Sequence, residues 1–308
     1  MLWYAYEMSL RRQVKALMTR QPVNRAVTTA AKALTTITGG PPEWLAKHLP
    51  RVGDVSVPLP NGSVLNLSSP GDDPIANRVY WWGLEGYEPE TARIWFALAR
   101  RASTIFDLGA FTGYFSILAS LSSPSAQVHA FEPIPELYER LRKNVALNRL
   151  SHVTCVPSAA GRVDGPARFF RGTDAVPSCS SLSRTFAQVH CSSVHEIEVP
   201  VVRLDTYASR QGIQTVELLK IDTESTEPDV LAGMPLLLER SHPHIICEVF
   251  AGDETGRTLE TLLEPFGYRY YLLTDGGLQP KAHITADSRW RNQLFSTADL
   301  AVVLRDDR

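Results

Sequence analysis

From about residue 88 onward, short apolar segments alternate with longer segments that have helical periodicity. Such a chain predicts a mostly parallel sheet with helices on both faces, because each helix returns the chain to the edge where the next strand begins. The expected strands are 104–108, 127–132, 152–157, 216–222, 244–250, 268–273 and 299–304. The pattern therefore predicts an α/β fold with a seven-stranded, mostly parallel sheet. Two further extended segments, 167–171 and 196–202, flank a loop rich in Ser, Thr and Cys.

The chain before this region has a different composition. Residues 1–50 hold seven Lys or Arg against two Asp or Glu, which is +5, so the rest of a chain with net charge −2 carries −7. Apolar residues at three- and four-residue steps predict a helix over 2–37, and Asn61-Gly62 between VSVPLP and SVLNL predicts a β-hairpin. We expect 1–85 to be a helical extension with a hairpin linker, and 86–308 to be the main domain.

Composition excludes several classes of protein. A pI near 6.5 provides no basic field for a phosphate backbone, so nucleic-acid binding is disfavoured. No apolar run of about 18 residues is present, and the N-terminus lacks the pattern of a secretory signal peptide. We therefore expect a cytoplasmic protein. The basic N-terminal helix is expected either to pack on the body, to contact a second copy of the chain as a homo-oligomer, or to lie on an anionic membrane surface.

The cysteine pattern also favours a reducing, cytoplasmic environment. The four cysteines are widely spaced and include no C-x-x-C pair: Cys155, Cys179, Cys191 and Cys247. This spacing predicts free thiols rather than a disulfide framework. The two cysteines and two histidines within 179–195 also lack the paired spacing of zinc ligands.

The segment IFDLGAFTGYFSI places an acid and a glycine-rich turn between an apolar strand and a helix. Ligands bind at such turns in open α/β sheets, because backbone N–H groups and the helix dipole face the crevice. The spacing from Gly109 to Gly113 is G-x-x-x-G rather than the dinucleotide fingerprint, and Asp107 suits a cationic ligand better than a pyrophosphate. The next strand ends in Glu132, where a carboxylate can accept ribose hydroxyls. The alternatives are a tight turn for the glycines and a helix cap for Glu132.

A second group of acids follows the strand at 216–222, in the sequence KIDTESTE. Asp222 and Glu224 leave that strand, and Glu248 ends the next one. A carboxylate at such a strand end can remove the proton of a bound hydroxyl group. Three carboxylates also suit Mg²⁺, and the sequence leaves that choice open. The alternative for Glu224 and Glu227 is that they begin a helix, where the dipole favours acids.

These motifs follow one another in the order of the FkbM-type S-adenosylmethionine-dependent methyltransferases. The segments IFDLGAFTGYFSI, VHAFEPIPELYERLRKNVALN, VPVVRLDTY, VELLKIDTESTEPDVLAGM and IICEVF resemble D-x-G-A-N-x-G, A-F-E-P, L-D, K-I-D-x-E-G-x-E and E-V. The resemblance covers about residues 86–304 and implies a Rossmann-like methyltransferase fold. It also implies O-methylation of a hydroxyl on a secondary metabolite, sugar or glycolipid. Phe111 stands where the family usually has Asn, and Ser225 where it usually has Gly.

The resemblance implies S-adenosylmethionine as the cofactor and a small hydroxylated molecule as the acceptor. The residues expected to bind the cofactor are Glu88, Asp107, Gly109, Ala110, Phe111, Thr112, Gly113, Glu132, Pro133, Ser158, Ala159 and Asp222. The expected catalytic residues are Asp222, Glu224 and Glu248. Two other functions remain open: a nicotinamide-dependent oxidoreductase that uses the same crevice, and a binding module in which the departures at 111 and 225 have removed activity.

Overall fold

The computed structural model describes residues 20–37, 40–173, 176–177, 179–250 and 253–300. The chain divides into two compact units, Met1–Glu88 and Pro89–Arg308. Among the described residues, no helix combines the length and the apolar character needed to cross a membrane.

The first unit is a set of helices with one hairpin. Its elements are α2 (Gln21–Ile37), α3 (Glu43–His48), β1 (Gly53–Pro58), β2 (Val64–Ser69), α4 (Pro74–Trp82) and the 3-10 helix η1 (Gly83–Gly86). The predicted hairpin is confirmed, since β1 pairs antiparallel with β2. The predicted N-terminal helix is confirmed over α2, and its residues 2–19 lie outside the described part of the chain. Asn24 ties α2 to the hairpin, because its side chain accepts a hydrogen bond from Val52 N at 2.8 Å and donates one to Pro50 O at 2.8 Å.

The second unit begins with α5 and contains two sheets. Its first half comprises α5 (Pro89–Ala99), β3 (Thr104–Leu108), α6 (Tyr114–Ser122), β4 (Gln127–Phe131), α7 (Pro135–Leu147), β5 (Val153–Val156), β6 (Ala159–Ala160), β7 (Gly165–Gly172), α8 (Arg184–His190) and β8 (Val194–Val202). Its second half comprises α9 (Leu204–Gln211), β9 (Leu218–Ile221), α10 (Glu227–Ala232), α11 (Pro235–Ser241), β10 (His244–Glu248), α12 (Asp253–Leu263), the 3-10 helix η2 (Glu264–Phe266), β11 (Arg269–Thr274), β12 (Gly277–Lys281) and β13 (Asn292–Ser296).

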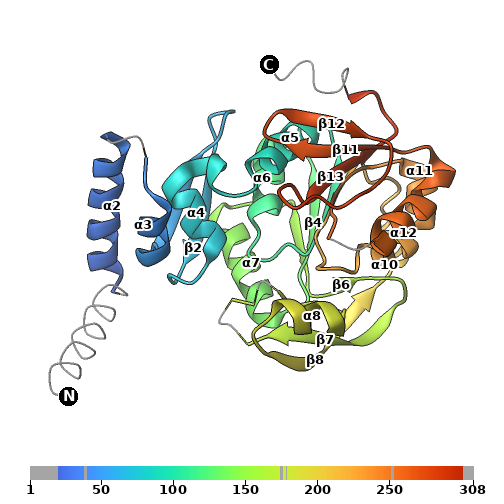
Figure 1. Ribbon diagram of the computed structural model, residues 1–308, viewed down its shortest axis with the longest axis horizontal. Coiled ribbons are helices and arrows are strands. Elements are labelled where there is room, and N and C mark those ends of the chain that lie inside the picture. Colours follow the sequence, from blue (N-terminus) through green and yellow to red (C-terminus); the bar gives the residue numbers. More distant parts are fainter. Residues whose placement is uncertain (1–19, 38–39, 174–175, 178, 251–252, 301–308) are drawn as a thin grey trace. The chain divides into compact units, whose positions relative to one another are not determined.

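One large sheet organises this unit, with strand order β12-β11-β13-β10-β9-β3-β4-β5. The strands β5, β4, β3, β9 and β10 are parallel, and β13 runs antiparallel to both of its neighbours. Figure 1 shows α5, α6 and α7 on one side of this sheet and α10, α11 and α12 on the other. The predicted Rossmann-like α/β fold is therefore confirmed.

Two details of the predicted sheet are wrong. The last strand was expected over 299–304, but Asp299 and Leu300 are not in a strand, and 301–304 lie outside the described residues. A strand that the sequence pattern did not predict is β13. Its sequence NQLFS has only two apolar residues, Leu294 and Phe295, so it shows no alternation of apolar and polar residues. The sheet also has eight strands, because β11 turns back into β12 as a hairpin.

The two extra extended segments are confirmed as β7 and β8, which form a smaller sheet of order β6-β8-β7. The loop between them contains the short helix α8. Figure 1 shows α8, β7 and β8 lying together as one layer beside the large sheet.

The register of the parallel strands sets the position of the functional groups. Leu108 on β3 pairs with Phe131 on β4 and with Ile221 on β9, and Ile221 pairs in turn with Cys247 on β10. These four strands therefore end level with one another. The residues that follow them meet at one edge of the sheet, where the strand order reverses between β3 and β9 and where open α/β sheets bind ligands.

Candidate active site

The glycine turn after β3 lies in close contact with the exit of β9. Gly109 has a φ of 82°, and a Cβ atom built on it would lie 1.9 Å from the carbonyl oxygen of Asp222. Gly113, with a φ of 97°, precedes α6 directly, and a Cβ there would lie 2.7 Å from Leu141 Cδ1. A side chain at Gly109 would collide with backbone, whereas one at Gly113 would have to displace the end of the Leu141 side chain and adopt an unfavourable φ. The turn thus brings Gly109 against the first residue after β9.

Glu132 joins this turn to the next helix. Its Oε2 accepts a hydrogen bond from Phe111 N at 3.0 Å, and its Oε1 accepts one from Ile134 N at 2.9 Å. The carboxyl group is buried, and this burial raises its pKa to about 8 against the two backbone hydrogen bonds, which act to lower it. Glu132 therefore holds the backbone of the glycine turn and of the residue before α7, although it does not cap α7, and its oxygens still have free lone pairs.

Asp107 is buried at the end of β3 and accepts a hydrogen bond from Ser116 Oγ of α6 at 2.5 Å. Burial raises the pKa of Asp107 to about 6, although the charge of Lys220 and the hydrogen bond from Ser116 act to lower it. Its hydrogen bond thus links β3 to α6.

Asp222, Glu224 and Glu248, which the sequence could not show to converge, come together at two neighbouring strand ends. One carboxylate oxygen from each lies within 4.8 Å of the other two. Two cations neutralise this acid cluster: Lys220 Nζ lies 2.5 Å from Asp222 Oδ2, and Arg291 Nη1 lies 3.6 Å from Glu248 Oε1. Lys220 is buried, and its ammonium group lies 4.5 Å from the ring centre of Phe115.

The three carboxyl groups hold their protons with different strengths. Burial acts to raise the pKa of Asp222, but Lys220 and a hydrogen bond from Glu248 hold it below its ordinary value. Burial, reinforced by the charge of Asp222, raises the pKa of Glu224 to about 9 and that of Glu248 to about 11. At neutral pH the cluster therefore contains one carboxylate, Asp222, and two carboxylic acids.

A strained loop carries Glu224. Glu224 has a φ of 57° and Ser225 a φ of 76°, which are uncommon values for residues other than glycine. Glu227 holds this loop, since its Oε1 accepts hydrogen bonds from Thr223 N at 3.2 Å and Ser225 N at 3.1 Å, and it is also the first residue of α10. The helix-start alternative is therefore correct for Glu227, and not for Glu224, which precedes the helix.

Both departures from the resemblance fall at positive φ. Phe111 has a φ of 53° and Ser225 a φ of 76°. The family's usual Asn and Gly are the residues that adopt this left-handed conformation most easily. This chain keeps the same backbone with less suitable residues, and Phe111 packs its ring against an apolar cluster that includes Ile134 and Leu137.

The other predicted cofactor residues lie in several places. Ala110 and Thr112 belong to the glycine turn, and the buried Oγ1 of Thr112 has no hydrogen-bond partner among the described residues. Pro133 follows Glu132. Ser158 follows β5, and Ala159 is buried in β6. Glu88 belongs to the first unit, so its role stays a prediction.

Sequence reasoning did not assign roles to Lys220, Arg291 or Ser116. Lys220 lies in the KID motif, two residues before Asp222. Side chains two residues apart on a strand point to the same face, so this spacing could have indicated that Lys220 lies beside Asp222. Arg291 lies far away in the chain, just before β13, and no local pattern pointed to it.

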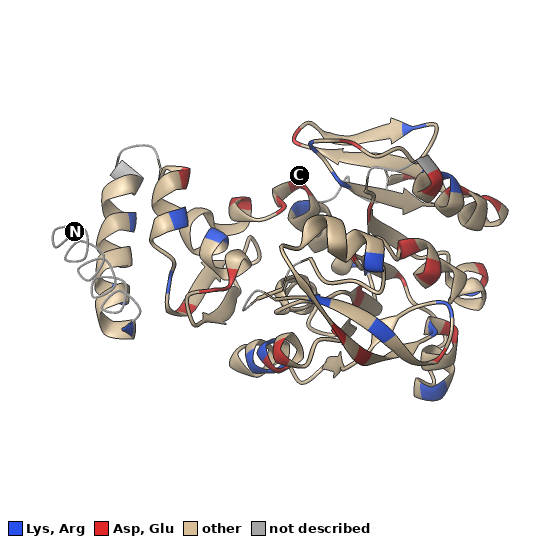
Figure 2. Ribbon diagram, turned by 60° about the horizontal axis from the view of Figure 1, so that its bottom comes forward, with Lys and Arg blue, Asp and Glu red and all other residues tan. Residues whose placement is uncertain are grey.

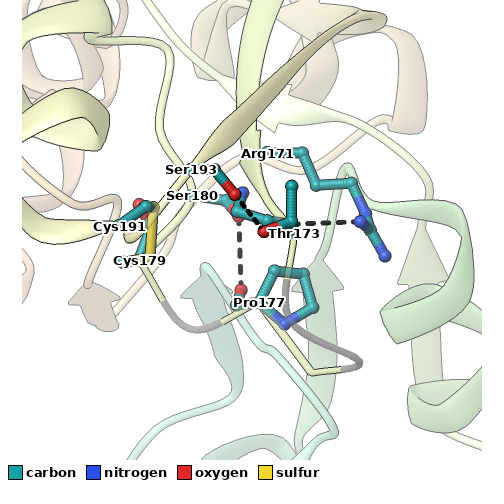
Figure 3. Close-up of a disulfide and its surroundings, with 8 residues drawn as sticks. Arg171, Thr173, Pro177, Cys179, Ser180, Cys191 and Ser193 are labelled. Carbon is teal, nitrogen blue, oxygen red and sulfur yellow. Dashed lines mark hydrogen bonds between the residues drawn. A yellow bond between two sulfur atoms is a disulfide. The ribbon is translucent and has the colours of Figure 1, made fainter.

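The prediction that all four cysteines are free is wrong. Cys179 and Cys191 form a disulfide, whereas Cys155 and Cys247 are free (Figure 3). The two cysteines are twelve residues apart with α8 between them, and this spacing does not match a recognised disulfide motif. Sulfur atoms bonded to each other cannot serve as thiolate ligands, so zinc binding by these cysteines is excluded in the disulfide form.

Charges of both signs are interspersed over the second unit. Figure 2 shows Lys and Arg side by side with Asp and Glu along its helices and strands. The second unit therefore has no surface dominated by one sign of charge in this view, and its distinctive charged groups are the buried ones at the strand ends, such as Asp107 and Lys220.

The chain matches known proteins over this same region. The sequence profile of the FkbM methyltransferase domain matches residues 107–270, which is more than half of the chain. The 31-O-demethyl-FK506 methyltransferase FkbM of Streptomyces tacrolimicus is 32% identical over 158 residues, covering 44% of this chain and 60% of that protein. Methyltransferase 1 of Beauveria bassiana is 27% identical over 183 residues, covering 54% of this chain and 72% of that protein.

Solved methyltransferase structures are more distant. The methyltransferase FkbM from Methylobacillus flagellatus is 16% identical with a TM-score of 0.40, covering 73% of this chain and 55% of that one. The O-methyltransferase TomG from Streptomyces achromogenes, solved with SAM, is 12% identical with a TM-score of 0.39, covering 68% of this chain and 80% of that one.

Proposed function

We propose that this chain, which belongs to the FkbM methyltransferase family, transfers the methyl group of S-adenosylmethionine to a hydroxyl group of a small molecule. The observation that carries the proposal is the level ending of β3, β4, β9 and β10. Because of this register, the glycine turn, Glu132 and the acid cluster of Asp222, Glu224 and Glu248 all lie at one edge of the sheet. Glu132 stands where a carboxylate can accept the hydroxyl groups of a ribose.

The residues around the glycine turn fit S-adenosylmethionine. Gly109 and Gly113 let the backbone approach a ligand closely. The buried, unpartnered hydroxyl of Thr112 offers one hydrogen bond at the same turn. Each oxygen of Glu132 already accepts one backbone N–H and can accept one ribose hydroxyl as well. Asp107 and Asp222 are acids at this edge of the sheet that suit a cofactor carrying an ammonium and a sulfonium group.

The cofactor, when bound, supplies an electrophilic methyl group. We assign Asp222 to accept the proton of the attacking hydroxyl, because it is the ionised member of the cluster. Lys220 keeps Asp222 ionised, and the proton on Glu248 is hydrogen-bonded to Asp222, which orients the carboxylate. Glu224, being protonated, can donate a hydrogen bond to the acceptor.

Mg²⁺ is the competing interpretation of the acid cluster. The three carboxylate oxygens lie within 4.8 Å of one another and are ligands of the type that Mg²⁺ prefers. Because Asp222 is the ionised member of the cluster, the nearby positive charges of Lys220 and Arg291 already balance its negative charge, which favours the metal-free mechanism. Activity retained in EDTA supports the metal-free assignment, and activity restored only by added Mg²⁺ replaces it.

The acceptor class is proposed from the relatives. The name of the Streptomyces relative describes methylation of an oxygen on FK506. We propose by analogy a hydroxylated secondary metabolite, with sugars and glycolipids as the other members of the screen. A cytoplasmic location, contact of the basic N-terminal helix with a membrane surface, and homo-oligomer formation all stay predictions.

The test uses methyl-labelled S-adenosylmethionine and a panel of hydroxylated polyketides, sugars and glycolipids. We expect label on one class of acceptor, loss of transfer in Asp222→Asn, and retention of transfer in the matched control Asp275→Asn, whose carboxylate is exposed and pairs with Arg289. Cofactor binding without transfer to any panel member favours the non-catalytic alternative. Binding of NAD in place of S-adenosylmethionine favours the oxidoreductase.

A further inference from the structure

We infer that Ser181 positions the loop that carries Glu224, and that the Cys179–Cys191 disulfide holds Ser181 in place, so that methyl transfer depends on the redox state of this cysteine pair. The inference rests on the function proposed above, because it concerns regulation of the same acid cluster.

Ser181 makes a direct contact with the acid loop. Its Oγ donates a hydrogen bond to the carbonyl oxygen of Glu224 at 2.5 Å, and its side chain is fully buried. Glu224 and Ser225 both have positive φ, so this part of the loop has a costly backbone conformation that needs outside support. The carboxylate of Glu227 supports the loop by accepting hydrogen bonds from Thr223 N and Ser225 N. Ser181 fixes the carbonyl group of Glu224.

Backbone pairing and the disulfide fix Ser181 in turn. Its N–H and C=O form an isolated bridge with Phe170 of β7, at 3.1 and 2.8 Å. Two residues before it, Cys179 is bonded to Cys191, the residue that ends α8. We call residues 179–191 the clasp.

The clasp packs tightly on β7 at the disulfide. A Cβ atom on Gly172 would lie 3.1 Å from the sulfur of Cys179 and 3.2 Å from that of Cys191, so a side chain here would push both sulfurs away from the strand. Gly172 N also donates to Ser180 Oγ at 3.0 Å, and Figure 3 shows Ser180 beside the two sulfurs. The disulfide therefore joins both ends of the clasp where they contact the strand.

A second contact connects the clasp with Glu248. Phe186 of α8 packs edge-to-face on Phe250, with ring centres 4.8 Å apart. The guanidinium carbon of Arg291 lies over the ring of Phe250, 5.2 Å from the ring centre. Arg291 also pairs with Glu248. The clasp thus touches the supports of two of the three acids.

Reduction of this bond is ordinary thiol–disulfide exchange. A thiolate of an external dithiol attacks one sulfur and breaks the S–S bond, which leaves a mixed disulfide and one free cysteine. The second thiol of the reductant then attacks the mixed disulfide, so that two cysteine thiols are formed and the dithiol is oxidised to its disulfide. Opening the loop restores the conformational freedom that the bond removes, and Ser181 loses its fixed position.

The experiment compares oxidised, reduced and reoxidised protein by amide hydrogen exchange and by activity. We expect reduction to speed exchange of the amides at 181–191 and 223–227 by about five- to tenfold, the effect of losing a hydrogen bond that held a local structure, with reversal on reoxidation. Amides of β3 and α6 serve as the internal reference, and their exchange stays unchanged. Ser181→Ala keeps the disulfide. It speeds exchange at 223–227 and at Ser183, whose N–H donates to Ser181 Oγ at 2.8 Å, and leaves the rest of 181–191 unchanged.

The activity measurement separates positioning from general loosening. With an acceptor found by the panel described above, reduction and Ser181→Ala lower kcat, while the KM for S-adenosylmethionine and the Kd for S-adenosylhomocysteine stay within about threefold. Cys155→Ser is the control for thiol chemistry elsewhere, since Cys155 is free, and it leaves the response to reductant intact.

The two failures are distinguishable. Absence of S-adenosylhomocysteine binding in the oxidised protein refutes the proposed function. The proposed function survives, and the redox control through the clasp is refuted, if kcat is unchanged after reduction. The same holds if amide exchange at 223–227 is unchanged by both reduction and Ser181→Ala.

Discussion

Replacing Lys220 by Met tests the electrostatics of the acid cluster. Methionine keeps most of the apolar stem against Phe115 but removes the charge that pairs with Asp222 and faces Asp107. Removing one partner of a buried ion pair costs about 3–5 kcal/mol, because the remaining charge is left without compensation. For a unit of this size each kcal/mol shifts Tm by about 2–4 °C, so we expect a fall of roughly 6–20 °C at pH 7.5.

The pH dependence distinguishes this cause from loss of packing. In the wild type the pKa of Asp222 lies below its ordinary value, so its stabilising contribution is present at both pH 7.5 and pH 5 and is lost only when the pH falls below that ordinary value. The variant lacks that contribution and relieves its unpaired charge by protonation. The difference in Tm between the two proteins is therefore expected to shrink at pH 5.

Calorimetry or circular dichroism at both pH values measures the effect, and Lys143→Met on the exposed side of α7 is the matched control. A fall below about 3 °C at pH 7.5, or one that is equally large at pH 5, refutes the assignment of Lys220 as the counter-ion of Asp222.

Three further predictions concern the turns and Glu132. Ser225→Gly relieves a positive φ and is expected to raise stability by about 1 kcal/mol, seen as a higher Tm, whereas an unchanged or lower Tm contradicts the strain argument. Gly109→Ala places a Cβ 1.9 Å from the Asp222 carbonyl oxygen, so we expect loss of S-adenosylhomocysteine binding together with a marked fall in Tm, and near-native values for both would show that the turn is looser than described. Because burial raises the pKa of Glu132 to about 8, folding takes up a proton between its ordinary pKa and that value, and stability falls as pH rises toward 9. Glu132→Gln is expected to flatten this slope in a Tm series from pH 5 to pH 9, and an unchanged slope would assign it to other groups.

Local patterns were sufficient to predict the parallel part of the sheet. The strands β3, β4, β9 and β10 are mostly buried apolar runs bounded by turn residues, β5 is a shorter, partly buried one, and the residues at their ends follow from strand direction alone. The meeting of Asp222 with Glu248 could be expected for the same reason, because both end parallel strands.

Features that depend on distant chain segments were not predictable in this way. The antiparallel strand β13 is polar, and its place between β10 and β11 depends on sheet pairing rather than on its own sequence. Arg291 reaches Glu248 only because β13 pairs with β10. The disulfide likewise depends on α8 folding back onto β7, which brings two widely spaced cysteines together.

The most direct test of the central claim is calorimetric titration of the folded wild-type protein with S-adenosylhomocysteine, S-adenosylmethionine and NAD, repeated with Glu132→Gln. The account predicts micromolar binding of both sulfur compounds, no binding of NAD, and at least tenfold weaker binding in the variant, as expected for loss of one carboxyl oxygen as a hydrogen-bond acceptor. Absence of binding to either sulfur compound, or binding that Glu132→Gln leaves unchanged, contradicts the placement of the cofactor at this edge of the sheet.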